Sequence, residues 1–243
     1  ITKFVNALTV AAEVGGPSAS AYLLGYPDHY TGHIFKTFFW KGYVRYAMRD
    51  IPATSTLNSV VEDDEGPERV VIASARGSVL PLSKVNDYVF RPRECGAMSL
   101  YEFLRRTDVK AVGHDDNSDF STNDSPDDME ADLPAGGSFT FLQGHPQKST
   151  HRVTVRSAER PWTLNFTGGV LPRPDRGDRE EYAFVMLVLF APGGWRTGRD
   201  LLCGRDSFSD AFQNTDFAAE HTRVMRNMNV LYECQDARDD YSA

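Results

Sequence analysis

The pattern of apolar and polar positions divides the chain into short elements of two kinds. Helices are predicted where apolar residues recur at helical spacing or follow a capping residue, at 1–14, 17–25, 99–106, 178–190, 207–213 and 217–240. The strongest of these, 178–190, begins with Asp178 and Glu181 at capping-box spacing and continues into an unbroken apolar body. Ser99 and Glu102 repeat the same spacing at the start of the helix over 99–106.

Strands are predicted where short apolar or alternating runs lie between turn residues, at 69–74, 78–83, 87–92, 138–142, 151–156 and 162–166. The sequence Ala75-Arg76-Gly77 between the first two runs predicts a hairpin. The aromatic stretch 33–47 alternates like a strand in its early part, and it fits a segment buried on both sides equally well. The pattern as a whole predicts a mixed α+β protein of short strands and helices.

One acidic stretch interrupts this pattern. Residues 114–132 hold eight of the 34 acidic residues and no lysine or arginine. Their few apolar side chains cannot bury enough surface to order the stretch, so we expect a disordered acidic insert. The chain then has three parts: an N-terminal α+β segment 1–112, an acidic disordered linker 113–136 and a C-terminal α+β segment 137–243.

The same stretch accounts for the net charge of −8, because the other 26 acidic residues balance 26 lysines and arginines. The net charge argues against a nucleic-acid surface over the whole chain, but it leaves room for a local basic face. The longest apolar run, 182–190, is too short to span a bilayer, and the first residues show no signal-peptide pattern. Three widely spaced cysteines indicate no disulfide framework. We expect a soluble intracellular protein with no membrane partner.

Candidate metal ligands gather in the stretch YPDHYTGHIF at 26–35. Its two histidines are four residues apart, which places them on one face only if the stretch is helical. The proline and glycine between and beside them favour a loop, in which the imidazoles would instead cap backbone groups. The metal candidates are Asp28, His29 and His33, with His145 and His151 as further donors.

Arginines mixed with aromatic side chains indicate where nucleic acid would bind. Such mixtures occur at 40–49, 171–180 and 193–200. Aromatic rings that stack on bases, beside arginines that neutralise phosphates, are typical of sequence-tolerant binding to single-stranded DNA. An aromatic core with solvated arginines is the alternative interpretation. The predicted contact residues are Trp40, Lys41, Arg45, Arg173, Arg176, Trp195, Arg196 and Arg199.

The sequence contains no motif for nucleotide or covalent chemistry. Neither the P-loop pattern G-x-x-x-x-G-K-[ST] nor the nucleophile elbow G-x-S-x-G occurs, and the glycines of 193–200 are wrongly spaced for a phosphate loop. We therefore assign no catalytic residue and leave enzyme activity undecided.

Three stretches occur in a characteristic order: EVGGPSASAYLLGYPDHYTGHIFKTFFW, then LPRPDRGDREEYAFVMLVLFAPGGWRTGRDL, then MRNMNVLYECQDARDDYSA. This order resembles the Helitron transposon proteins, especially the fungal ones, over nearly the whole chain. In that family a rolling-circle nickase of the HUH type precedes an ATP-dependent DNA helicase, and the resemblance implies the region between them. It further implies a nuclear location and flanking nickase and helicase domains as partners. ATP and Mg are implied for the helicase domain only, and no cofactor for this chain.

We therefore expect a non-catalytic connecting region that positions single-stranded DNA or the neighbouring catalytic domains, within a longer polypeptide. Two alternatives stay open. One is a pseudogene-like fragment or structural module without a ligand. The other is a metal-dependent enzyme that uses the cluster of Asp28, His29 and His33.

Overall fold

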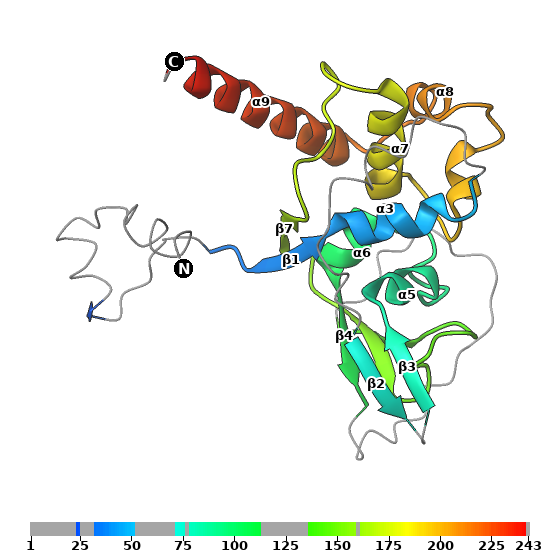
Figure 1. The fold of residues 1–243 in the computed structure, drawn as a ribbon. Helices are drawn as coiled ribbons and strands as arrows, with labels where there is room; N and C mark the ends of the chain where they lie inside the picture. The colour runs from blue at the N-terminus through cyan, green and yellow to red at the C-terminus, as the bar shows by residue number, and fades with distance from the viewer. Residues whose placement is uncertain are drawn as a thin grey trace, which may run out of the picture. The chain divides into compact units, whose positions relative to one another are not determined.

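The computed structural model describes residues 23–24, 32–51, 71–75, 78–112, 136–158 and 161–241. Nearly all of them belong to one compact unit, Phe35–Ala243, which contains helices and strands and is a mixed α+β fold, as predicted (Figure 1). In chain order the elements are β1 (Phe35–Phe39), α3 (Trp40–Met48), β2 (Val71–Ala75), β3 (Ser78–Leu82), α5 (Lys84–Val89), α6 (Leu100–Arg106), β4 (Thr107–Ala111), β5 (Ser138–Thr140), β6 (His151–Val155), β7 (Thr163–Thr167), α7 (Arg179–Phe190), the 3₁₀ helix η1 (Gly198–Leu202), α8 (Phe208–Gln213) and α9 (Ala219–Tyr241).

The strands of the described part form three small sheets. β1 pairs in parallel with β7, β2 and β3 form the predicted hairpin, and β6 lies between β4 and β5 in an antiparallel sheet. β1 and β4 precede the acidic stretch in the sequence, whereas β7 and β6 follow it. Residues from both sides of that stretch therefore share sheets within one unit.

Helix α7 lies at the centre of the core. Its N-terminus is capped as the sequence predicts, because the Asp178 carboxylate accepts a hydrogen bond of 2.8 Å from the Glu180 amide. Every residue from Tyr182 to Phe190 is buried, so the helix is apolar all round and must be covered on all sides. Its covering includes α3, α6 and α8.

The strand prediction for 87–92 is wrong, because Lys84–Val89 form helix α5. The Ser83 hydroxyl accepts a hydrogen bond of 3.3 Å from the Val85 amide and caps this helix. The buried residues Val85, Tyr88 and Val89 recur at spacings of three and four, which is the helical period. A six-residue helix is too short for that period to stand out from a strand-like apolar run.

The aromatic stretch 33–47 is strand only at its beginning. It forms strand β1 over Phe35–Phe39, and helix α3 begins at Trp40. The alternating apolar pattern of its early part predicted the strand but not the helix. The helices predicted over 1–14 and 17–25 lie outside the described residues, apart from Leu23 and Leu24. The acidic insert also lies outside them, apart from the boundary residue Gly136. Among the described helices, none combines the length and apolar character needed to cross a membrane.

Candidate nucleic-acid interface

Helix α3 separates an apolar face from a basic one. Trp40, Tyr43 and Val44 are among its buried residues, and the helix packs against α7. Arg45 is half-buried and Arg49, one turn further along the same face, is exposed. The guanidinium of Arg49 lies 5.3 Å from the centre of the Tyr46 ring. The core packing of α3 therefore leaves its C-terminal turn with arginines at the surface.

The turn and 3₁₀ helix that follow α7 are fixed tightly against the end of α3. A side chain at Gly198 would overlap the carbonyl oxygen of Ala47, so only glycine allows this close approach. Thr197 and Asp200 form a capping box at the start of η1. Partial burial raises the pKa of Asp200, but hydrogen bonds from the amides of Thr197 and Arg196 outweigh it and hold that pKa below its usual value.

These two segments bring arginines together that are distant in the sequence. The Nε of Arg199 donates a hydrogen bond of 3.0 Å to the carbonyl oxygen of Asp50. A hollow of about 610 Å³ between the segments is lined by Arg49, Asp50, Ile51, Thr197 and Arg199. We call Arg49 and Arg199 the α3–η1 arginine cluster; the half-buried Arg45, also predicted from the sequence, is not among the residues that line the hollow. Within the part of the chain that the structure describes, neither arginine of the cluster is ion-paired with a carboxylate.

Of the other predicted residues of these segments, three are buried and Arg196 is half-buried and bound to the backbone of α5. The Trp195 side chain is 1% exposed and donates from Nε1 to the Val188 carbonyl at 2.8 Å. Trp40 is also 1% exposed, and Lys41 beside it is buried. Arg196 is half-buried and donates to the carbonyl oxygen of Val89 at the C-terminal end of α5. Neither indole presents a face on which a base can stack, so the buried Trp40, Lys41 and Trp195 support the surface and do not form it.

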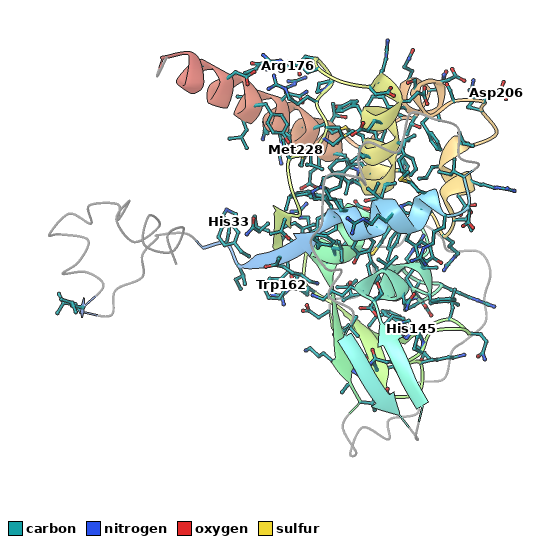
Figure 2. The ribbon with its side chains drawn as sticks, in the orientation of Figure 1. His33, His145, Trp162, Arg176, Asp206 and Met228 are labelled. Atoms are coloured by element: carbon teal, nitrogen blue, oxygen red, sulfur yellow. The ribbon has the colours of Figure 1, made fainter. Side chains whose placement is uncertain are left out.

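The arginines of the third predicted segment are engaged by carboxylates. Arg173 forms a two-pronged pair with Asp175, at 2.9 and 2.7 Å, and a further ion pair of 2.8 Å with Asp236 of α9. Arg176 lies beside α9 and pairs with Asp236 at 3.1 Å (Figure 2). The hydrogen bonds from Arg173 hold the pKa of Asp175 below its usual value. These pairs join the loop before α7 to α9 and neutralise the charge that the sequence offered to DNA.

A buried arginine that the sequence did not reveal holds the turn before η1. Arg91 is 2% exposed and donates to five carbonyl oxygens, those of Tyr88, Cys95, Gly96, Gly193 and Trp195, at distances from 2.8 to 3.5 Å. Its guanidinium also lies 4.3 Å from the centre of the Tyr88 ring. Burial lowers the pKa of Arg91, although an arginine stays charged. The segment RPREC gives no signal of this role, because all five acceptors are backbone atoms.

The metal candidates are only partly within the described residues. Asp28 and His29 lie outside them, and His33 lies two residues before β1 (Figure 2). His145 is buried, with its Nε2 3.0 Å from an Asp87 oxygen and its ring stacked on Phe141 at 3.8 Å. His151 lies 2.9 Å from the Thr150 hydroxyl. No three metal-ligating side chains converge in the described parts of the chain.

Comparison with protein-family models, with curated proteins and with solved structures finds no match to this chain.

Proposed function

We propose that this chain is the non-catalytic connecting region of a Helitron-like replicase and DNA helicase, and that it positions single-stranded DNA for the neighbouring catalytic domains. The observation that carries the proposal is that Arg49 and Arg199 line the same hollow. They belong to two segments that the sequence analysis identified independently as candidate DNA-binding segments. The family assignment, the nuclear location and the nickase and helicase partners rest on the sequence resemblance. ATP and Mg would belong to the helicase domain.

The burial of the two indoles decides the kind of DNA contact that we propose. Guanidinium groups bind phosphate oxygens through parallel hydrogen bonds and do so without reading a base. The α3–η1 arginine cluster would therefore hold the backbone of the strand, with little sequence preference and with a marked dependence on salt. Such contacts suit a region that places a strand and leaves its chemistry to other domains.

One carboxylate in the same hollow opposes this binding. Asp50 lines the hollow between Arg49 and Arg199, and its side chain is ion-paired with no described residue. Asp200, also nearby in η1, has much of its charge engaged by backbone amides. The arginines thus attract the phosphates of a strand, whereas the negative charge of Asp50 repels them. We therefore expect a modest affinity for single-stranded DNA.

The test is a titration of the purified chain with a fluorescent single-stranded oligonucleotide at several salt concentrations. Arg49→Gln with Arg199→Gln should weaken binding about tenfold and should lower the slope of log K against log salt by about 1.4, since each phosphate contact on a single strand contributes about 0.7. The matched control is Arg223→Gln with Arg226→Gln, which removes the same charge from the exposed side of α9. The control should leave both the affinity and the slope close to those of the unaltered chain.

Two results would contradict the proposal. Absence of salt-dependent oligonucleotide binding by the unaltered chain would favour a structural module without a ligand. Equal losses in the two double variants would mean that the chain responds only to its net charge and has no local site. Circular dichroism of each variant separates a lost contact from a lost fold.

A further inference from the structure

A second basic hollow lies at one end of the three-stranded sheet, and the proposed function makes no use of it. The hollow measures about 360 Å³ and is formed by the loop before β6 together with the ends of β5 and β6. Lys148 and Arg152 contribute its cations, and Thr140 and Ser149 contribute hydroxyls. None of the described residues that line it is a carboxylate. Its size is within the range of small-ligand pockets.

The register of the sheet adds a third cation next to this hollow. Arg152 of β6 lies directly between Lys110 of β4 and Thr140 of β5. The flanking residue Val153 is buried, so the row from Lys110 through Arg152 to Thr140 belongs to the opposite face of the sheet. Two like charges directly opposite each other in an antiparallel pair repel. An anion bound between them would remove that repulsion.

The three cations in and beside the hollow form no ion pairs among the described residues. None of Lys110, Lys148 and Arg152 forms an ion pair with a described carboxylate. Asp108 belongs to the same face of β4, but its two oxygens accept hydrogen bonds from Arg156, at 2.9 Å, and from Trp162, at 2.8 Å. Its charge is therefore engaged elsewhere on the sheet.

The loop that shapes the hollow is built on a buried histidine. His145 accepts a hydrogen bond of 3.0 Å at Nδ1 from the Gln147 amide, and Asp87 lies 3.0 Å from its other ring nitrogen (Figure 2). Arg152 donates from Nη1 to the carbonyl oxygens of Lys148 and His151, at 2.9 and 3.0 Å. Its Nε and Nη2 make no hydrogen bond to the described residues. The guanidinium is thus held in place by one edge while the other is available to a ligand.

We propose that this hollow binds a phosphate group. Arg152 and Lys148 would neutralise its negative charge, and the hydroxyls of Thr140 and Ser149 would donate hydrogen bonds to its oxygens. Lys110, opposite Arg152 in the sheet, would add positive charge beside the site. A guanidinium fork, an ammonium and hydroxyl donors match the several acceptor oxygens of a tetrahedral phosphate. The group has two sources, a small phosphorylated molecule and the backbone of a nucleic-acid strand. This site goes beyond the proposed function, because it uses none of the α3–η1 arginines.

The test is calorimetric titration of the full chain with inorganic phosphate, at an ionic strength held constant with chloride. Lys148→Gln with Arg152→Gln should weaken phosphate binding at least tenfold. The Arg223→Gln and Arg226→Gln variant, which has the same net charge, and the Arg49→Gln and Arg199→Gln variant should bind phosphate as the unaltered chain does. The last comparison separates this site from the proposed function.

A second set of variants distinguishes a lost ligand contact from a distorted loop. Arg152→Lys keeps the charge but loses the guanidinium fork, so it should weaken phosphate binding less than Arg152→Gln does, whereas Thr140→Val should weaken it two- to fivefold without moving the melting temperature. Absence of phosphate binding by the unaltered chain, or equal binding by the Lys148→Gln and Arg152→Gln variant, would overturn the proposal.

A competing 5′-hydroxyl oligonucleotide, which carries only backbone phosphates, identifies the source. If the oligonucleotide displaces phosphate, and the Lys148 and Arg152 variant loses oligonucleotide affinity, the site receives a strand. If phosphate binds and the oligonucleotide does not displace it, the site receives a small phosphorylated molecule.

Discussion

Two arginine-bearing regions of this protein look alike in sequence and differ in the charge they leave at the surface. In the loop before α7, Arg173 and Arg176 are both paired with Asp236 of α9. In the α3–η1 arginine cluster, Arg49 and Arg199 line a hollow without a carboxylate partner among the described residues. The difference arises because Asp236 of α9 is ion-paired with the arginines of the first region, whereas Asp50 and Asp200, which lie near the second, form no described ion pair with Arg49 or Arg199. The carboxylates that the fold brings within reach decide which arginines are available to a ligand.

The largest effect on the α3–η1 region should come from replacing Arg91. Arg91→Met removes five side-chain hydrogen bonds to carbonyl oxygens, three of them buried, and we expect it to lower the free energy of unfolding by about 4 kcal/mol. The turn before η1 would no longer be held beside α3, so the α3–η1 cluster would lose its geometry. Urea denaturation followed by circular dichroism measures the first effect.

The control for this change lies two residues away. Arg93 is exposed and its side chain has no partner among the described residues, so Arg93→Met should change the free energy of unfolding by less than about 0.5 kcal/mol. An Arg91→Met protein that unfolds at the same urea concentration as the unaltered chain would show that the five hydrogen bonds contribute little.

A smaller effect is expected where η1 approaches α3. Gly198→Ala would place a methyl group against the Ala47 carbonyl and push the two segments apart, at a cost of about 2 kcal/mol. Oligonucleotide binding should weaken with it, because Arg49 and Arg199 would separate. Thermal unfolding and the fluorescence titration measure the two effects.

Gly42→Ala in α3 is the matched control for Gly198→Ala. A methyl group at Gly42 would meet the Phe39 ring at an ordinary 3.4 Å, and alanine favours the helix. The control should be neutral or slightly stabilising, with unchanged binding. If Gly198→Ala binds the oligonucleotide as well as Gly42→Ala does, the contact between η1 and α3 does not organise the arginines.

The smallest effect should come from a change that leaves the arginines of both regions without a carboxylate partner. Asp175→Asn with Asp236→Asn would release Arg173 and Arg176 from their ion pairs. We expect about a threefold gain in affinity for single-stranded DNA and only a small loss of stability, since exposed pairs contribute little. Fluorescence titration measures the gain.

The control for that release is Asp206→Asn with Asp216→Asn, which makes the same change in net charge at two exposed aspartates without a described ion pair (Figure 2). An equal gain in both variants would mean that net charge alone sets the affinity, and the comparison of the two regions would lose its meaning.

The sequence predicted the elements whose signals are local. The Ser99 cap and the apolar body behind Asp178 identified α6 and α7, and the hairpin of β2 and β3 followed from its turn. Helix α5 was mistaken for a strand because six residues hold less than two turns of helical pattern. η1 was missed because it depends on a close approach to Ala47, far away in the sequence.

The candidate site was predictable in part, for the same reason. Its segments were identified from their arginines, but the sequence could not separate Trp195, which the core surrounds, from Arg199, which the core excludes. It also could not show that Asp236 neutralises Arg173, because that pair joins positions more than sixty residues apart. Burial and pairing at long range are properties of the fold and leave no local pattern.

The backbone-only environment of Arg91 has a consequence for the behaviour of the protein in acid. The ion pair of Arg173 with Asp175 exists only while that carboxylate is ionised, and Asp175 has a lowered pKa in the folded chain. The contribution of this pair is therefore present above the ordinary pKa of an aspartate and is lost as the pH falls through the lower, folded value. The carbonyl acceptors of Arg91 do not titrate. Acid should thus release the Arg173–Asp175 pair in the loop before α7 while Arg91 still holds the turn before η1, a difference that hydrogen exchange at low pH can resolve.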